Sequence, residues 1–160
     1  MVQHVMRRKD RETDTAEAME LLKCGEYGVM AMVDTNGEPY AVPLSYILEE
    51  GAIYFHCAKV GRKIDALKFN PKVCFTVVGT IEAVYDKSFS TYYESVVVFG
   101  HIIEIEDFTR KTEFLMCLTE KYLPAHVDKA TAEIAKSLEC TSVYCIQIEK
   151  CTGKAKKRPY

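Results

Sequence analysis

The dipeptide Asn36-Gly37 most constrains the fold, because Asn-Gly between apolar runs is the strongest short-range signal for a β-hairpin. It lies in the turn-forming segment Asp34–Gly37, between the apolar runs Tyr27–Val33 and Tyr40–Leu48. We predict that these two runs are paired strands. Glu49–Gly51 then turns the chain again into a third strand, so this part of the sequence predicts an antiparallel meander.

The third strand leads into the segment with the most distinctive chemistry. Ile53–His56 is rich in β-branched and aromatic residues and predicts a strand that ends near Cys57-Ala58. Apolar residues at helical spacing between Gly61 and Asn70-Pro71 predict a short helix. This helix would begin with Gly61-Arg62-Lys63, so unpaired backbone N–H groups and two cationic side chains would meet in one small volume. That combination is typical of a phosphate site, and the alternative is a solvated basic helix start.

The rest of the chain predicts further helices and strands. Helices are expected at Thr13–Cys24, Thr109–Tyr122 and Thr131–Leu138, and strands at Val73–Val78, Val96–Ile105 and Ser142–Ile148. The first of these strands is almost continuously apolar, which predicts burial on both faces and an end at Gly79. Ile81–Ser90 is less regular, Gly100 is expected to permit a bend or a close approach, and the chain from Gly153 onward is expected to be a loose tail.

Composition limits the class of protein. One hundred and sixty residues suit a single domain, here 1–160 with a peripheral N-terminal arm (1–12) and basic tail (152–160). A net charge of −2 gives no general attraction to nucleic acid or acidic membranes. With neither a signal-peptide pattern nor an apolar run of about 18 residues, we expect a cytoplasmic protein without a membrane partner. Seven dispersed cysteines indicate reduced thiols, and without a Cys-x-x-Cys pair we assign no metal site.

Six motifs occur in an order that resembles a known family. They are Met6–Glu12, Pro39–Tyr46, Ile53–His56, Gly61–Lys63, Asn70–Phe75 and Tyr93–Gly100. This order is similar to that of the flavin-binding split barrels related to pyridoxamine 5'-phosphate oxidase, and within them to the nitroimidazole-resistance (Nim-like) group. The resemblance spans nearly the whole chain. It implies a mainly β (α+β) fold, a six-stranded antiparallel split β-barrel with flanking helices, which forms a homodimer with flavin mononucleotide (FMN) at the subunit interface.

The resemblance also implies which residues contact the cofactor. In the family, an Arg-Lys pair after the third strand holds the flavin phosphate, a second strand follows the flavin ring, and a polar residue of the partner subunit contacts the flavin. The corresponding positions here are Pro43, Leu44, Ser45, Tyr46, His56, Cys57, Ala58, Gly61, Arg62, Lys63 and Ser95. For Leu44 and Tyr46 the alternative is an ordinary strand role, and for His56 a structural one. His56 is the candidate catalytic residue, because an ordinary histidine pKa near 6.5 suits proton donation to a substrate.

The implied function is that of an FMN-dependent oxidoreductase acting on a small acceptor, such as a nitroaromatic. Two alternatives remain: a non-enzymatic flavin-binding or redox-sensing module, and a haem or deazaflavin binder in which His56 would be an axial ligand to haem. Residues 153–160 lack the Arg-x-His-containing substrate motif of the true oxidases, so pyridoxamine phosphate is not the expected substrate. The chain also lacks a Gly-x-Gly-x-x-Gly fingerprint, so a nicotinamide donor would bind only transiently.

Overall fold

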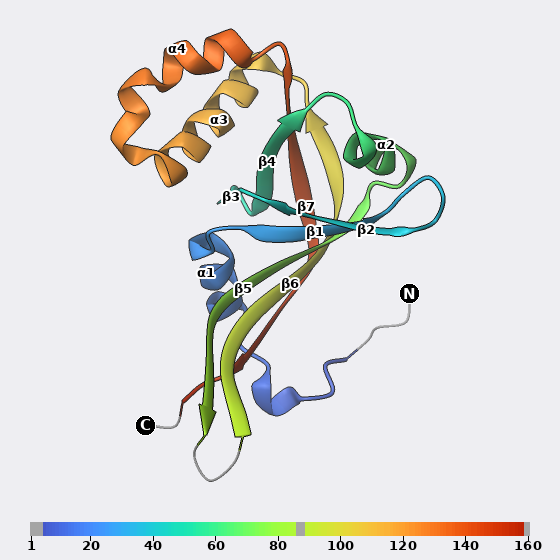
Figure 1. The fold of residues 1–160 in the computed structure, drawn as a ribbon, viewed down its shortest axis with the longest axis vertical. Helices are drawn as coiled ribbons and strands as arrows, with labels where there is room; N and C mark the ends of the chain where they lie inside the picture. Colours follow the sequence, from blue (N-terminus) through green and yellow to red (C-terminus); the bar gives the residue numbers. More distant parts are fainter. Residues whose placement is uncertain (1–4, 86–88, 159–160) are drawn as a thin grey trace.

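The structure, a computed structural model, describes residues 5–85 and 89–158. Residues 1–4 of the expected arm, residues 86–88 of the segment expected to be less regular and residues 159–160 of the expected tail lie outside the described part. The described residues form one seven-stranded antiparallel sheet, ordered β2-β1-β5-β6-β7-β4-β3, with helices at its flanks and ends (Figure 1).

The elements have the following bounds. The strands are β1 (Gly28–Val33), β2 (Pro39–Leu44), β3 (Ile47–Glu49), β4 (Ala52–Ala58), β5 (Lys72–Tyr85), β6 (Phe89–Ile105) and β7 (Thr141–Lys156). The α-helices are α1 (Thr15–Cys24), α2 (Arg62–Phe69), α3 (Phe108–Tyr122) and α4 (Val127–Ser137), and short 3-10 helices span Lys9–Arg11 and Pro124–His126.

The sheet curls into a barrel because its two edge strands are consecutive in the chain. β2 pairs with β1 and β3 pairs with β4, and only Ser45 and Tyr46 separate them. The predicted fold class is confirmed, but the second predicted strand, Tyr40–Leu48, is two strands, which makes seven instead of six. Tyr46 breaks it: its backbone N–H donates to the Tyr122 phenol oxygen (2.9 Å) and its carbonyl accepts from Lys121 Nζ (3.0 Å).

Two cores lie on opposite faces of β4. The first fills the barrel and includes the fully buried Phe55 and Phe75. The second lies between β4, β7 and the helices α3 and α4, where the rings of Tyr54 and Phe114 stack with centroids 3.6 Å apart. Because successive side chains of a strand point to opposite faces, β4 contributes to both cores. This burial holds the segment that carries His56 between the barrel and the helices.

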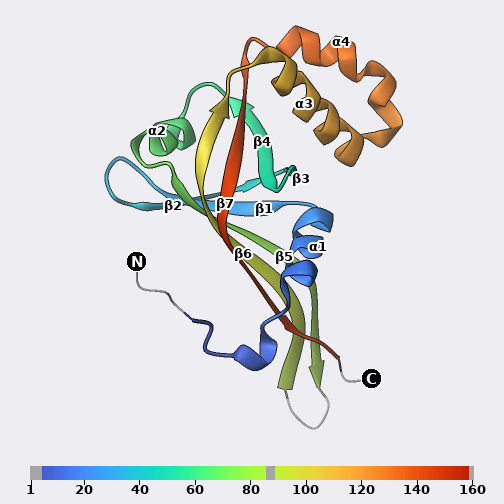
Figure 2. The same ribbon diagram turned by 180° about the vertical axis from the view of Figure 1, so that it is seen from behind.

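The strand β5 is longer than predicted. It continues through Gly79 to Tyr85 and forms a long hairpin with β6 that projects from the barrel, as two views show (Figures 1 and 2). The register shifts between Val78 and Ile81, so Gly79 lies at a β-bulge and does not end the strand. The prediction of irregular structure from Ile81 is therefore wrong for the described residues. Burial on both faces is also wrong, because buried and more exposed residues alternate from Lys72 to Val78.

The C-terminal strand is also longer than predicted. β7 pairs with β6 as far as Lys156, so the loose tail expected from Gly153 onward is a strand up to that residue. A Cβ atom at Gly153 would lie 2.0 Å from the Thr13 hydroxyl, which shows how closely the start of α1 approaches β7. Glu12 forms an isolated bridge with Lys154. The peripheral location expected for 1–12 and 152–160 is thus wrong for Glu12 and for 152–156.

Local signals predicted the remaining elements well. Asp14 caps α1 by accepting a hydrogen bond from the Glu17 backbone (2.8 Å). The predicted hairpin turn is also confirmed: Asp34 Oδ1 accepts from the backbone of residues 36 and 38, and Gly37 has φ 82°. At Gly100 the register with β7 shifts, and a Cβ atom there would lie 2.1 Å from the Gln147 carbonyl oxygen. The expected close approach is therefore present.

Candidate functional site

The loop from β4 to α2 carries most of the predicted site residues. β4 ends at Ala58, and Gly61 has φ 122°, a conformation that favours glycine. Apart from Gly61 and its two chain neighbours, no atom of the described residues lies within 4 Å of the position that a Gly61 Cβ would take, so the space in front of α2 is open. Within the same residues, no side chain caps this helix. The first backbone N–H groups of α2 therefore face open space, which is the arrangement that binds anions.

The side chain of Arg62 turns toward the β1–β2 hairpin. Its guanidinium lies 2.7 Å from Asp34 Oδ2 and stacks over the Tyr40 ring at 4.3 Å. The hydrogen bond from Arg62 is the main cause that lowers the Asp34 pKa, and the Glu38 backbone N–H adds to it. Arg62 is thus paired with a carboxylate that sequence reasoning did not identify.

Lys63 has different neighbours from Arg62. Its Nζ lies 5.7 Å from the centroid of the Phe55 ring, and its charge acts on the nearby His56 and Cys57 side chains. It forms no ion pair with a carboxylate of the described residues. The two cations were expected to share one volume, and Lys63 is the one whose charge is not already neutralised.

His56 lies on the face of β4 that points toward α3 and α4. It pairs directly with Val143 of β7, whose side chain belongs to the core beneath these helices. With the exposed Ser45 and with Leu118 and Tyr122 of α3, it lines a cavity of about 440 Å³. Partial burial in this cavity, and then the charge of Lys63, lower the His56 pKa. The imidazole is therefore mainly neutral at pH 7.

We expect the His56 imidazole to titrate below pH 6.5, the ordinary value, because burial and a nearby cation both disfavour its charged form. In Lys63→Ala the midpoint should rise but stay below 6.5, since burial is the larger cause and remains. NMR titration of the ring protons measures this. Lys68→Ala, an exposed lysine of the same helix, is the control and should leave the midpoint unchanged. A midpoint above 6.5 in the unmodified protein would contradict the expectation.

Tyr46 does not present its ring to a ligand. The side chain is fully buried, donates a hydrogen bond to the Leu22 carbonyl (2.5 Å) and packs edge-on against Phe75 at 5.0 Å. Burial is the main cause that raises its pKa. The structure thus favours the structural role that was the alternative for this residue. At the end of β2, Pro43 is exposed and Leu44 half-buried next to Ser45.

The three other predicted site residues are Cys57, Ala58 and Ser95. Cys57 is half-buried, and burial raises the pKa of its thiol, so it is protonated at neutral pH. Ala58 is exposed at the end of β4. Ser95 lies on β6 opposite Lys154 and lines a separate groove beside α1, away from His56. Its expected contact was with the flavin of the partner subunit, and this remains a prediction.

The sequence did not predict that α3 forms a wall of the cavity at His56. Tyr122 and Thr119 come from a helix more than sixty positions after His56, and no spacing connects them. The sequence predicted the helix that carries them, Thr109–Tyr122, but not its position beside His56. Within residues 5–85 and 89–158, no three His, Cys, Asp or Glu side chains gather as a metal site would require. No helix in the same residues is long and apolar enough to cross a membrane.

Comparison with known proteins adds a family and a set of similar folds. The family model described as pyridoxamine 5'-phosphate oxidase matches residues 14–155. No curated protein matches the chain. The solved structures that it resembles include the flavocytochrome Anf3 from Azotobacter vinelandii, with 24% identity, a TM-score of 0.82, and 98% of this chain and 74% of that chain covered.

Two more solved structures share the fold. The FAD and haem binding protein from Mycobacterium smegmatis has 21% identity and a TM-score of 0.78, with 92% of this chain and 74% of that chain covered. A proposed 5-nitroimidazole antibiotic resistance protein from Bacteroides thetaiotaomicron has 21% identity and a TM-score of 0.74, with 97% and 100% covered. At these identities the likeness establishes the split-barrel fold.

Proposed function

The chain belongs to the pyridoxamine 5'-phosphate oxidase family, and on that premise we propose that it is an FMN-binding oxidoreductase that reduces a small acceptor such as a nitroaromatic. The observation that carries the proposal is the loop before α2, where Lys63 without a carboxylate partner adjoins uncapped helix N–H groups. An ammonium and free N–H groups side by side suit a phosphate. Two of the similar structures are named as flavin proteins, which supports the same cofactor class.

These residues fit a flavin phosphate in three respects. The open space around Gly61 admits the group, Lys63 supplies charge, and the α2 N-terminus supplies hydrogen-bond donors. When bound, the flavin supplies the redox chemistry, and the protein supplies position and electrostatics. His56 and Ser45 line the same cavity, and the charge of Lys63 acts on His56, so we propose that these two residues orient an acceptor and hold a proton for it.

The visible absorption spectrum of the purified protein, before and after addition of FMN, tests the cofactor. A flavin spectrum that persists after gel filtration supports the proposal, and a colourless protein contradicts it. Reduction by a nicotinamide, followed by reoxidation with an added nitroaromatic, then tests the reaction. Tight flavin binding without turnover would instead favour a binding or redox-sensing module.

His56→Ala is expected to keep flavin bound but to slow acceptor reduction by about 10²- to 10⁴-fold, the usual contribution of a positioned acid or base. Because its pKa is lowered, the protonated imidazole is a minor form at pH 7. Turnover that depends on this acid should rise as the pH falls toward the His56 pKa. Steady-state rates as a function of pH measure both effects. His101→Ala, a histidine on β6 paired with Glu149, is the control. Unchanged turnover in His56→Ala would contradict a catalytic role.

We also propose a homodimer with the flavin at the subunit interface. The outer faces of β1, β5 and β6 carry exposed apolar side chains, among them Val29, Val33, Val78 and Phe99. The register places Ala31, Cys74 and Phe99 side by side across these three strands, so the apolar side chains form one continuous surface. Contiguous exposed apolar surface is the usual mark of a protein interface. A second copy of the chain is the partner that the family resemblance implies.

Phe99→Glu should convert this dimer to a monomer, because a buried unpaired carboxylate opposes association. Light scattering coupled to gel filtration would then give half the mass of the unmodified protein. Phe69→Glu, which changes another exposed phenylalanine on α2, is the control and should leave the mass unchanged. A monomer in the unmodified protein, or a Phe99→Glu variant of unchanged mass, would contradict this interface.

A second candidate function is haem binding, favoured by one observation on His56. This side chain is accessible in a cavity with apolar walls from α3 and α4, as an axial ligand must be. Two similar structures are named as a flavocytochrome and an FAD and haem binding protein. Titration with haemin and measurement of the Soret band tests this function. Binding that His56→Ala abolishes and His101→Ala preserves would support it.

A further inference from the structure

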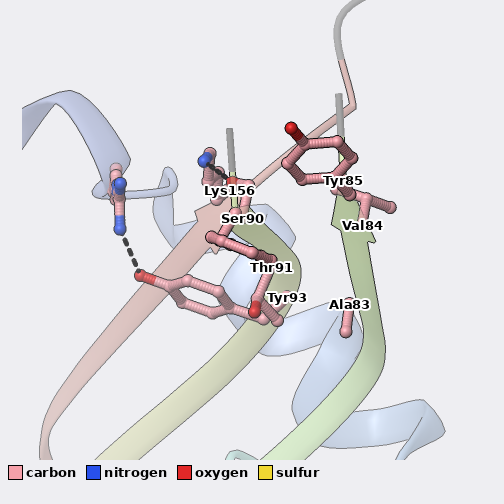
Figure 3. A pocket seen from close by; sticks show the side chains of 9 residues that line it. Ala83, Val84, Tyr85, Ser90, Thr91, Tyr93 and Lys156 are labelled. Carbon is pink, nitrogen blue, oxygen red and sulfur yellow. Dashed lines mark hydrogen bonds between the residues drawn. The ribbon is translucent and has the colours of Figure 1, made fainter. Parts of the chain in front are cut away.

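A cleft lies at the projecting end of the β5–β6 hairpin, at the opposite end of the molecule from α2, α3 and α4 (Figures 1 and 3). Its volume is about 740 Å³, and it opens widely to the surface. Tyr85 comes from β5, Ser90 and Tyr93 from β6, Lys156 from the end of β7 and Arg11 from the N-terminal 3-10 helix. The β5–β6 hairpin, the N-terminal 3-10 helix and the end of β7 therefore build it.

Two half-buried cations define one side of the cleft. Arg11 donates a hydrogen bond to the Tyr93 phenol oxygen (3.1 Å), and Lys156 donates one to the Ser90 hydroxyl (Figure 3). These partners fix the cations without neutralising them, because both are hydroxyl groups. No Asp or Glu is among the described residues that line the cleft. A guanidinium has five N–H donors and an ammonium three, so donors remain for a ligand.

The positive potential of the cations also acts on the Tyr93 phenol, which lies between them. The hydrogen bond from Arg11 is the main cause that lowers the Tyr93 pKa, and the charge of Lys154 acts in the same direction. Lys154 Nζ lies 5.8 Å from the centroid of the Tyr93 ring. An anion held here would receive hydrogen bonds from positive groups in a partly desolvated position, which strengthens them.

Aromatic rings lie at the outer end of the same cleft. Tyr85 and Phe89 have centroids 5.1 Å apart, and their exposed fractions are 72% and 93%. The two rings are inclined by 48° to each other, so each offers its own face to a ligand. Planar heteroaromatic bases stack on tyrosine and phenylalanine with little sequence preference. The cleft thus combines an anion site and an aromatic platform.

From this combination we propose that the cleft binds a nucleoside monophosphate, with the phosphate on Arg11 and Lys156 and the base stacked on the Phe89 ring beside the inclined Tyr85. Within one chain the cleft is separate from the flavin site proposed at Lys63 and His56, because α2 and the end of β4, which carry these residues, lie at the other end of the molecule (Figure 1). It gives the basic N-terminal segment and the basic end of β7 a common role. Both were expected to be peripheral.

Isothermal titration with adenosine monophosphate, with and without saturating FMN, tests the proposal on the full chain. We expect one site per chain, unaffected by FMN, with weaker binding of adenosine and of inorganic phosphate. Arg11→Gln and Lys156→Gln should each weaken binding by about 10-fold or more, as expected for loss of a charge-assisted hydrogen bond. Phe89→Ala should weaken the binding of adenosine monophosphate but not the binding of inorganic phosphate. Lys129→Gln, an exposed lysine on α4, is the control and should have no effect.

Several outcomes would overturn the proposal. The first is the absence of saturable binding, and the second is equal affinity for inorganic phosphate and for the nucleotide. The third is an equal loss of nucleotide affinity in all the lysine and arginine variants, because that would indicate only general electrostatic attraction. Displacement of the nucleotide by FMN would make the cleft part of the flavin site and would overturn the separate site. If FMN does not bind at all, the proposed function fails, and the titration without FMN still decides the present proposal.

Discussion

Lys63→Ala is expected to leave the protein folded and to weaken FMN binding by roughly 10- to 150-fold, the equivalent of about 1.5–3 kcal/mol for one hydrogen bond to a charged group. The reason lies in the contrast with its neighbour. Arg62 already neutralises Asp34 at 2.7 Å, whereas Lys63 has no carboxylate partner among the described residues. Most of the charge available to the flavin phosphate is therefore on Lys63. Fluorescence titration with FMN gives the dissociation constant, and far-UV circular dichroism confirms folding.

Two matched variants make this result specific. Lys68→Ala removes the same charge from the exposed last turn of α2 and should change the dissociation constant little. Arg62→Ala should weaken FMN binding less than Lys63→Ala does, because the Arg62 guanidinium is already hydrogen-bonded to Asp34. An equal loss in both arginine and lysine variants would mean that Arg62 leaves Asp34 for the phosphate. Unchanged affinity in Lys63→Ala would contradict the proposed phosphate site.

Phe75→Ala is expected to lower the free energy of unfolding by about 3–5 kcal/mol, as measured for deletion of a buried phenylalanine ring. Phe75 is fully buried in the barrel, packs against the Tyr46 ring at 5.0 Å and occupies the space that a side chain at Gly28 would need. Because β1 and β5 are paired there, their backbones hold the walls of the resulting cavity in place. Since whole domains are stable by about 5–15 kcal/mol, this loss is a large fraction of the total.

Urea unfolding with linear extrapolation measures this loss. The control is Phe69→Ala, a phenylalanine that is 60% exposed at the end of α2 and should change stability by no more than about 0.5 kcal/mol. If Phe75→Ala cost as little as the control, the ring would not be part of a close-packed core. An unchanged m-value would show that the variant unfolds from the same compact state.

The elements that the sequence predicts correctly have signals within a few residues. The Asn36-Gly37 turn and the close approach at Gly100 are of this kind. By contrast, the break at Tyr46 depends on Tyr122, 76 positions later, which binds the backbone that a sheet ladder would otherwise use. Gly79 illustrates the opposite error. A glycine in an apolar run indicates an end, but here it accommodates a bulge within a continuous strand.

The sequence proposed residues for the site, whose roles stay predictions, but did not indicate how they are arranged. Family resemblance identified Lys63, His56 and Ser45, and the register against Val143 then places His56 on the helix side of β4. The partner of Arg62 was not predictable, because Asp34 is 28 positions away and also belongs to a hairpin turn. The cleft at the hairpin end was missed because β5, β6 and β7 were all expected to be shorter.

The place of β7 in the sheet also determines when the protein can fold during its synthesis. β7 lies between β6 and β4, yet the ribosome makes it after both. Until Thr141–Lys156 has been translated, one edge of β6 and one edge of β4 therefore have no partner strand. Such edges expose unpaired N–H and C=O groups that readily pair with other chains. The nascent chain is thus most prone to aggregation just before its last described strand emerges, and the barrel closes only after translation of that strand.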